Sequence, residues 1–320
     1  MTDTRYLVHG VFWDGPAPAS GPVQPGPVPP GAVRAALRLQ DSAGAFTDVA
    51  LDAGTRLGFR LAGPGKGCLG HHRVHGPADR DHVVCPERAP AARGSQCGPC
   101  FAVDDSRLIH DFHRGGRVTP GLRAYLMQPH WLYVASFANG ASKIGTASQL
   151  RKWHRLAEQG AVVARYVARA ADGRIVRILE DLVTRDAGLP QQVRSAAKAA
   201  GLTAPVPAVA LEELNSRLAG GVRTLLGGVV LEGFDVVDER WQRPGLADAA
   251  CTPALRHAYP HDLGSDAHGF VVSSLSGSVA LARLDGADLD FVVNLGGLKA
   301  RTIELGDHGS EVPAVQESLF

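Results

Sequence analysis

The sequence lacks the features of a membrane or secreted protein. Its 320 residues contain no apolar run near the length of about 18 residues that a membrane-spanning helix needs. Its start, Met1 to Tyr6, is polar and has neither the basic nor the apolar region of a signal peptide. These absences predict a protein of the cytoplasm that has no membrane partner.

An excess of one charge is missing as well. The formal net charge is +1, so the chain as a whole exerts no pull on nucleic acid, and such binding needs a local basic patch. Aromatic residues make up only 6% of the chain, whereas hydrophobic residues make up 45%, which is enough to bury a large core. At this length we expect two or three subdomains.

Residues 1–62 are predicted to form a small antiparallel β-domain. Four segments have the character of strands: Tyr6–Trp13, Ala32–Gln40, Phe46–Leu51 and Thr55–Leu61. A stretch with seven prolines, Gly15–Gly31, separates the first two. Because proline has no backbone N–H, this stretch cannot join the interior of a sheet, and we expect an exposed loop.

Residues 63–128 hold four of the five cysteines, in a stretch rich in glycine and proline. Cys68, Cys85, Cys97 and Cys100 can together hold one tetrahedral Zn²⁺, and the last two form a C-x-x-C arm. A reducing compartment disfavours disulfides. Because four thiolates leave no open coordination position, the pattern predicts a structural zinc in a knuckle rather than a catalytic zinc.

Alternatives stay open for this segment. His71 follows Cys68 by three residues and can replace Cys85 as the fourth ligand, although thiolates are the commonest ligands of structural zinc. A redox C-x-x-C is less favoured, because no βαβ pattern surrounds it. The run that follows is either a phosphate-binding patch or a solvated connector, and it contains Arg107, His110, His113, Arg114, Arg117 and Arg123.

Residues 129–226 give the clearest local pattern in the chain. An Asn-Gly turn predicts a β-hairpin, a T-x-x-Q capping box predicts a helix that Gly160 ends, and an Asp-Gly turn leads into a second helix. The predicted order is β-β-α-β-α. Its elements are Trp131–Phe137, Ser142–Gly145, a helix from Thr146, Ala161–Ala168 and a helix from Asp172, followed by helices over Pro190–Ala200 and Val209–Leu226.

Residues 227–320 shift to a strand pattern and are predicted to form a C-terminal β-rich domain and tail. The strands are Val229–Val237, Gly269–Leu275, Ser278–Leu284, Leu289–Leu295 and Lys299–Leu305. Short glycine-containing turns separate the last four, which predicts a meander that closes a small barrel or packs on the N-terminal sheet. The predicted fold class is therefore α+β.

The motifs of residues 129–186 resemble the GIY-YIG nuclease core, with Leu132-Tyr133 in the first motif and Lys143-Ile144-Gly145 in the second. Most of residues 5–305 are similar to DUF2797, a bacterial domain family of unknown function. That family places a cysteine cluster before a P-H-x-L-Y strand, a K-x-G-T turn and an R-W…Q-G-A helix. The matching residues are Pro129-His130, Leu132-Tyr133, Lys143-Ile144-Gly145-Thr146, Trp153 and Gln159-Gly160-Ala161.

The GIY-YIG resemblance implies cleavage of phosphodiesters. In that family a motif tyrosine and a helix arginine help to activate water and steady the phosphate, and a glutamate holds one divalent ion. Tyr133 matches the tyrosine, and Glu180 is the glutamate of the second helix. Lys143 stands in place of a second tyrosine. Trp153 falls near the usual arginine position, with an arginine on either side, Arg151 and Arg155.

Three functions follow as expectations. The favoured one is a zinc-containing protein that binds nucleic acid. If its catalytic site is intact, it also cleaves phosphodiesters with Mg²⁺. The departures from the GIY-YIG motif favour a degenerate catalytic site. Its site residues are Tyr133, Lys143, Arg151, His154, Arg155 and Glu180. His154, like His130, is either a general base or a structural histidine. The alternatives are an enzyme that acts on a small molecule in the same cleft, and a non-catalytic protein that docks a partner through its proline loop and zinc ribbon.

Overall fold

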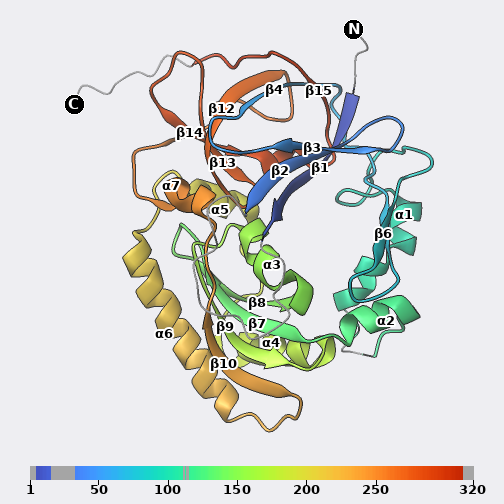
Figure 1. Cartoon of the computed structure of the whole chain (residues 1–320), viewed down its shortest axis with the longest axis vertical. Helices are drawn as coiled ribbons and strands as arrows, with labels where there is room; N and C mark the ends of the chain where they lie inside the picture. The colour runs from blue at the N-terminus through green and yellow to red at the C-terminus, as the bar shows by residue number, and fades with distance from the viewer. Residues whose placement is uncertain (1–4, 16–32, 111, 113–114, 313–320) are drawn as a thin grey trace.

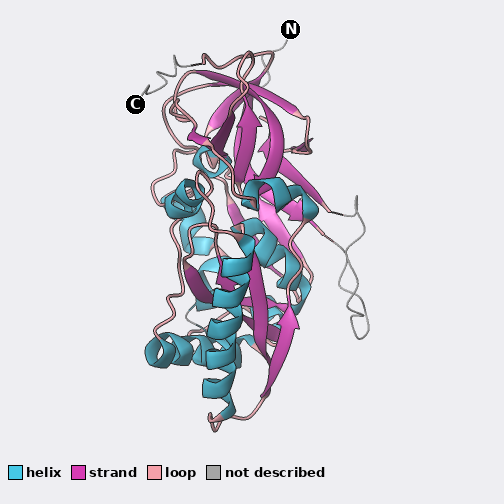
Figure 2. Ribbon diagram, turned by 90° about the vertical axis from the view of Figure 1, so that its left-hand side faces the viewer, coloured by secondary structure: helices cyan, strands magenta, loops and turns pink. Residues whose placement is uncertain are grey.

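The computed structural model describes residues 5–15, 33–110, 112 and 115–312. Within these ranges the fold is α+β, as the sequence predicts, with seven helices and sheets of nine, four and two strands. Figure 1 shows the nine-stranded sheet at one end of the molecule and the four-stranded sheet with its helices at the other, and Figure 2 shows the same arrangement from the side. No helix in this part of the chain is long and apolar enough to cross a membrane. The predicted proline-rich loop lies outside the described residues, apart from Gly15.

Strands from both ends of the chain share the nine-stranded sheet. Its order is β11-β14-β13-β12-β4-β15-β1-β2-β3, and every neighbouring pair is antiparallel except β11 and β14. Residues 1–62 and residues 227–320, which the sequence places in separate domains, therefore contribute to one sheet. The strands are β1 Arg5–Asp14, β2 Arg34–Gln40, β3 Phe46–Ala50, β4 Arg56–Leu61, β11 His257–Ala258, β12 Ala267–Ser276, β13 Val279–Arg283, β14 Asp290–Asn294 and β15 Thr302–Leu305.

The predicted C-terminal meander holds for β12, β13 and β14, which pair in sequence order. β15 leaves the meander and lies between β1 and β4, where Ile303 pairs with Tyr6 on one side and Leu61 on the other. Ile303 is fully buried. This pairing satisfies the backbone N–H and C=O groups that β1 and β4 would otherwise expose as edges. The C-terminal strands thus extend the N-terminal sheet through hydrogen bonds.

The four-stranded sheet has the order β10-β9-β7-β8. Its strands are β7 His130–Ser136, β8 Ser142–Ser148, β9 Val163–Ala170 and β10 Phe234–Arg240. The predicted hairpin is confirmed, because β7 and β8 pair across a turn in which Gly140 has a φ of 82°. With α3 Lys152–Gln159 after β8 and α4 Gly173–Ala187 after β9, the predicted β-β-α-β-α order is present. The Asp172 carboxylate caps α4 by accepting from two backbone N–H groups.

The predicted starts of two helices are wrong. β8 continues through the proposed capping box, because Thr146 pairs with Leu132 in the sheet, and α3 begins only at Lys152 after a short 3-10 turn. The Gln149 side chain instead accepts a hydrogen bond of 2.7 Å from the Trp131 indole. The helix predicted from Pro190 begins only at Ser195, as α5 (Ser195–Gly201). Pro190 instead contacts the sheet, because its carbonyl accepts a hydrogen bond from the backbone N–H of Ile144 in β8. Gly160 ends α3 with a φ of 69°, as predicted.

The two faces of the four-stranded sheet are covered differently. Leu132 and Val134 of β7 pack with α4 and with α6, Ala208–Gly227. The alternate residues, Tyr133 and Ala135, belong to a larger core that includes α3 and residues of the nine-stranded sheet. Removing a leucine or phenylalanine side chain from water stabilises a fold by about 1.5–3 kcal/mol, so these two cores supply most of the stability.

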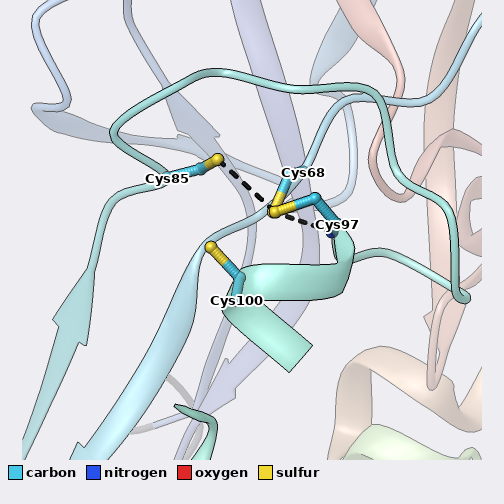
Figure 3. A group of neighbouring side chains, drawn as sticks. All are labelled: Cys68, Cys85, Cys97 and Cys100. Carbon is cyan, nitrogen blue, oxygen red and sulfur yellow. Dashed lines mark hydrogen bonds between the residues drawn. The ribbon is translucent and has the colours of Figure 1, made fainter. Parts of the chain in front are cut away.

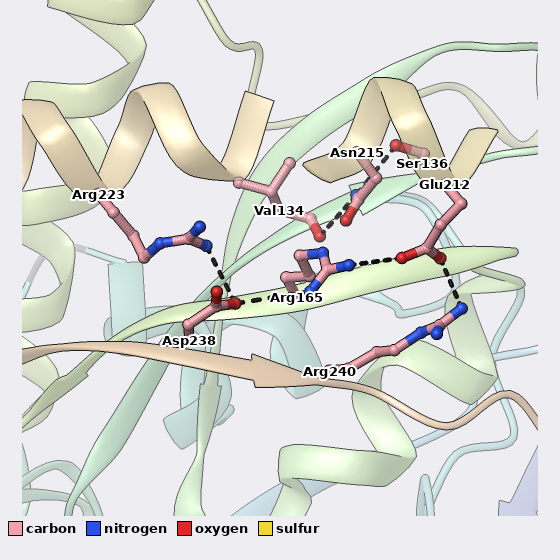
Figure 4. Close-up of polar contacts among 8 residues, drawn as sticks. All are labelled: Val134, Ser136, Arg165, Glu212, Asn215, Arg223, Asp238 and Arg240. Atoms are coloured by element: carbon pink, nitrogen blue, oxygen red, sulfur yellow. Dashed lines mark hydrogen bonds and ion pairs between the residues drawn. The ribbon is translucent and has the colours of Figure 1, made fainter. Parts of the chain in front are cut away.

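A network of charges and hydrogen bonds fixes α6 to its face of the sheet (Figure 4). The Arg165 guanidinium of β9 pairs with Glu212 of α6 at 2.5 Å and with Asp238 of β10 at 3.6 Å. Glu212 also pairs with Arg240, and Asp238 with Arg223. Beside this network, the fully buried Asn215 amide of α6 donates to Val134 O at 3.2 Å and to Ser136 Oγ at 3.0 Å. Each cation of the network therefore has a carboxylate partner.

The cysteine-containing segment forms a separate small module beside the nine-stranded sheet (Figure 1). It contains the hairpin of β5 His71–Val74 and β6 Arg80–Val83, the helices α1 Gly98–Val103 and α2 Pro120–Leu126, and a 3-10 helix over Asp105–His110. Rings join it to the sheet, because His82 lies 5.0 Å from His9 and 5.1 Å from Phe46, centroid to centroid. The short helix α7, Asp248–Cys251, is not part of this module and packs against β12.

Candidate metal centre and charged core site

Four thiols converge in the small module. The sulfur atoms of Cys68, Cys85, Cys97 and Cys100 all lie within 4.8 Å of one another, and all four residues are buried (Figure 3). Four sulfurs bound to one zinc at about 2.3 Å would be about 3.8 Å apart. The 3.9 Å between the sulfurs of Cys85 and Cys97 agrees with that spacing.

The local chain is shaped to hold these sulfurs. The Cys68 sulfur accepts hydrogen bonds from the backbone N–H groups of Gly70, at 3.3 Å, and Cys97, at 3.1 Å. Gly70 has a φ of 77°, and a Cβ there would lie 2.1 Å from Val83 O, so only glycine fits this turn. Cys97 is the N-cap of α1, which places Cys100 one turn further along the same helix.

The chemistry of the four thiols favours a bound cation. The backbone N–H of Cys100 holds the pKa of the Cys97 thiol below its usual value. Burial has the opposite effect and raises the pKa values of Cys68 and Cys100. A metal ion reverses such an effect, because it binds and stabilises thiolates. The residues present therefore fit a metal ion, and this is the only group of three or more histidine, cysteine or acidic residues among the described residues with that geometry.

In the structure Cys85, and not His71, lies with the other three cysteines in the group that could hold a metal ion. His71 is buried nearby, at 6% exposure, and neither of its ring nitrogens has a hydrogen-bond partner among the described residues. The fifth cysteine, Cys251, is buried elsewhere, in α7.

Tyr133 lies at the centre of the second candidate site. Its side chain is fully buried, and its hydroxyl accepts a hydrogen bond of 3.0 Å from Gln159 Nε2 of α3. Burial raises the pKa of Tyr133, and Arg155 opposes that shift through its nearby positive charge. Gly145, opposite Tyr133 in the hairpin, leaves room for the ring, because a Cβ there would lie 2.5 Å from the hydroxyl oxygen. Tyr133 and Arg155 thus belong to one site.

Lys143 faces the same site from β8. Its side chain is 7% exposed, its ammonium lies 5.7 Å from the centroid of the Tyr133 ring, and it donates to Gln191 O at 3.3 Å. Burial and, to a smaller extent, the charge of Arg155 lower the pKa of Lys143 to about 8, while the charge of Glu180 opposes this shift. Arg155 itself is exposed and has no carboxylate partner among the described residues.

The other predicted site residues are engaged in structural contacts. Arg151 pairs with Glu158 at 2.5 Å, and Glu180 pairs with Arg177 at 2.5 Å. His154 accepts a hydrogen bond from the Gly15 N–H at 3.3 Å, and burial lowers its pKa. His130 is buried and donates through Nδ1 to Gln128 O at 2.8 Å, which is a structural role. Of the six predicted residues, the structure brings Tyr133, Lys143 and Arg155 together, with Glu180 at the edge.

Two residues of this site were missed by the sequence analysis. Gln159 binds the Tyr133 hydroxyl, and its backbone carbonyl accepts a hydrogen bond of 2.9 Å from Lys198 Nζ of α5. Burial and, to a smaller extent, the charges of Lys143 and Arg155 together lower the pKa of Lys198 to about 7. A lone lysine in an alanine-rich helix carries no signal of this role. Only the contact between distant segments reveals it.

Comparison of the chain with protein-family models, with curated proteins and with solved structures found no match in any of the three.

Proposed function

We propose that this protein binds nucleic acid through a basic face of a GIY-YIG-like core without cleaving it, a function in line with the resemblance of residues 129–186 to GIY-YIG nucleases. The distribution of charge carries the proposal. Residues 129–226 contain 13 lysines and arginines against seven aspartates and glutamates, a surplus of six positive charges, whereas the whole chain has 33 against 32. The core is therefore the local basic region that phosphate binding needs.

The positions of the basic side chains on the two sides of the sheet also support nucleic-acid binding. On the α6 face, Glu212 and Asp238 neutralise the arginines. On the α3 side, Lys143, Arg155 and Lys198 act on one another as like charges. Arg80 of the small module lies near enough to Arg151 of α3 for that charge, after burial, to lower the pKa of Arg80. Cations of two elements thus converge beside α3.

The connector between the module and the core adds further basic residues. Arg107, Arg117 and Arg123 are exposed, as a phosphate-binding patch requires. His113, Arg114 and the side chain of His110 lie outside the described part of the chain. Guanidinium groups bind phosphate oxygens in pairs of hydrogen bonds, so exposed arginines in this run suit contact with a nucleic-acid backbone.

Three observations argue against cleavage. A buried Tyr133 with a raised pKa is a poor base. Lys143 replaces the second motif tyrosine, and the Glu180 carboxylate is paired with Arg177 rather than free for Mg²⁺. One carboxylate beside an arginine is a weak magnesium site, because Mg²⁺ takes one or two carboxylates together with substrate phosphates.

The metal of the small module is proposed to be a structural Zn²⁺. Four thiolates are a closed, soft ligand set that zinc favours and magnesium does not. The hydrophobic cluster around the cysteines includes only Ala89 besides the thiols themselves, so apolar packing alone holds this part of the module weakly. The metal would fix the module, and with it Arg80, beside α3.

The test is a salt titration of binding by the full chain. Fluorescence anisotropy with labelled single- and double-stranded DNA and RNA should give a logarithm of affinity that falls linearly with the logarithm of salt concentration, with a slope of roughly −3 to −5 for four to five phosphate contacts. The labelled strands should stay intact with Mg²⁺ present. A flat salt dependence, or no binding at low salt, would overturn the proposal of nucleic-acid binding, and cut strands would overturn the proposal that the site is degenerate.

A further inference from the structure

A pocket opens beside the charged core site, where four parts of the chain meet. Its volume is about 210 Å³. The end of β7, the C-terminal turn of α3, helix α5 and the hairpin between β12 and β13 line it. Since one water takes about 30 Å³ of liquid, the pocket has the size of roughly seven waters. It can therefore hold a small molecule.

The lining divides into a polar and an apolar part. Lys198, Ser195, Ser276 and Ser278 supply hydrogen-bond donors. Phe137, Leu202 and Val279 supply apolar contact on the other side. A ligand with one charged end and a short apolar group matches both parts at once.

The charge of Lys198 identifies the sign of that ligand. Lys198 donates one hydrogen bond, to Gln159 O, and its ammonium lies 4.1 Å from the Phe137 ring centroid. An ammonium has three donors, so donors are left for a ligand. Among the described residues Lys198 has no carboxylate partner, while Lys143 and Arg155 repel it. An anion in the pocket would relieve that repulsion.

Glu158 narrows the choice of anion. Its side chain also lines the pocket, and its carboxylate pairs with Arg151. A doubly charged phosphate would meet that carboxylate, whereas a singly charged carboxylate has less repulsion to overcome. Beside the pocket the backbones of Gly160 and Gly277 approach closely, because a Cβ on Gly277 would lie 2.7 Å from Gly160 N.

We propose that this pocket binds a small organic monocarboxylate, with the carboxylate at Lys198 and the serine hydroxyls and a short apolar group against Phe137, Leu202 and Val279. The pocket shares Lys198 with the cation group of the proposed nucleic-acid surface, but binding of a carboxylate to the free chain requires no nucleic acid. The competing explanation is that Lys198 only caps the C-terminal carbonyl of α3. That role requires no ligand, so the two explanations differ in what they predict for binding.

The test uses isobutyrate, its neutral isostere isobutyramide and inorganic phosphate, each titrated into the full chain by calorimetry and by thermal shift. Isobutyrate should bind with a stoichiometry of one and raise Tm, and isobutyramide should not. Lys198→Met should weaken isobutyrate binding by about tenfold or more, because it removes a charged hydrogen bond. Lys152→Met removes a lysine that pairs with Glu239 outside the pocket, and it should leave isobutyrate affinity unchanged.

Ser195→Trp is a second variant, which fills the pocket while it keeps Lys198. It should abolish isobutyrate binding, so the proposal stays testable even where Lys198→Met does not fold. Isobutyrate affinity should also fall as pH rises above 7, since Lys198, with a pKa of about 7, loses its proton there, and Lys143, with a pKa of about 8, loses its proton at higher pH. Equal binding of the amide, tighter binding of phosphate, or unchanged binding by both variants would each overturn the proposal.

Discussion

The two faces of the four-stranded sheet carry cations in opposite ways. On the α6 face, Arg165, Arg223 and Arg240 all pair with Glu212 or Asp238 (Figure 4). On the α3 face, the ammonium groups of Lys143 and Lys198 are held near Arg155, and no carboxylate pairs with them within the described part of the chain. Partial burial disfavours a charge without a counter-ion. Arg151 and Lys152, also on the α3 side, do pair with Glu158 and Glu239. We infer that the α6 face is balanced for structure, whereas Lys143, Arg155 and Lys198 on the α3 face are left to be balanced by a ligand.

The four thiols of the small module extend this comparison. They too are buried like groups, and their geometry could hold a metal ion. Removing the proposed zinc ion should have the largest effect on stability of any change considered, because structural zinc contributes about 10–16 kcal/mol of apparent binding energy in zinc-finger peptides.

Replacing Cys97 with serine should release the metal and unfold the module while the two sheets persist. The measurement is zinc content by atomic emission together with hydrogen exchange over residues 68–128. Cys251→Ser is the matched control, because it removes a buried thiol that is not a ligand, and its metal content should stay at one per chain. Metal retained by the Cys97 variant, or exchange unchanged over the module, would refute the proposed site.

Removing a counter-ion from the balanced face should come next in size. Glu212→Gln leaves both Arg165 and Arg240 without one of their partners and should lower the free energy of unfolding by roughly 2 kcal/mol, since the pair is only partly exposed. Urea denaturation followed by circular dichroism measures it. Glu213→Gln, at the exposed neighbouring position on α6, should change stability by less than about 0.5 kcal/mol. Equal effects of the two substitutions would remove the distinction between the faces.

The unbalanced face should show itself in the pH dependence of stability. The pKa of Lys198 is about 7 in the folded protein against 10.5 for an ordinary lysine. Between these values the unfolded chain carries a proton that the folded chain has lost, so this group makes stability rise with pH from 7 upward, and below 7 its effect is constant. From pH 7 to 9, the free energy of unfolding of the wild type should rise by roughly 1 to 2 kcal/mol more than that of Lys198→Met. Urea denaturation at each pH measures this difference. Parallel curves for the two proteins would contradict this account.

Local patterns in the sequence were sufficient for the elements that local contacts determine. The Asn139-Gly140 turn, the start of α4 after Asp172 and the end of α3 at Gly160 each depend on neighbouring residues, and each was predicted. The convergence of the four cysteines was expected as well, because their residue type and spacing restrict the chemistry. The predicted start of α3 was wrong, because the pairing of Thr146 with Leu132 in the sheet outweighs the local preference of a capping motif.

Contacts between distant segments account for what the sequence could not give. The place of β15 between β1 and β4 depends on pairing across most of the chain. The pocket at Lys198 depends on α5 meeting the end of α3 and the turn at Gly277. Neither contact produces a periodic pattern in the sequence. The site predicted from the sequence therefore lacked Gln159 and Lys198.

The most direct test of the central claim compares one charge reversal on each face. Arg155→Glu changes the α3 side, and Arg217→Glu makes the same change in net charge at an exposed position on α6. In fluorescence anisotropy with a labelled oligonucleotide, the account predicts that Arg155→Glu weakens binding about tenfold and makes its salt dependence shallower by about one to two units, while Arg217→Glu leaves both close to wild type. Equal losses for the two variants, or none for either, would contradict the claim that the α3 face is the one left for a ligand.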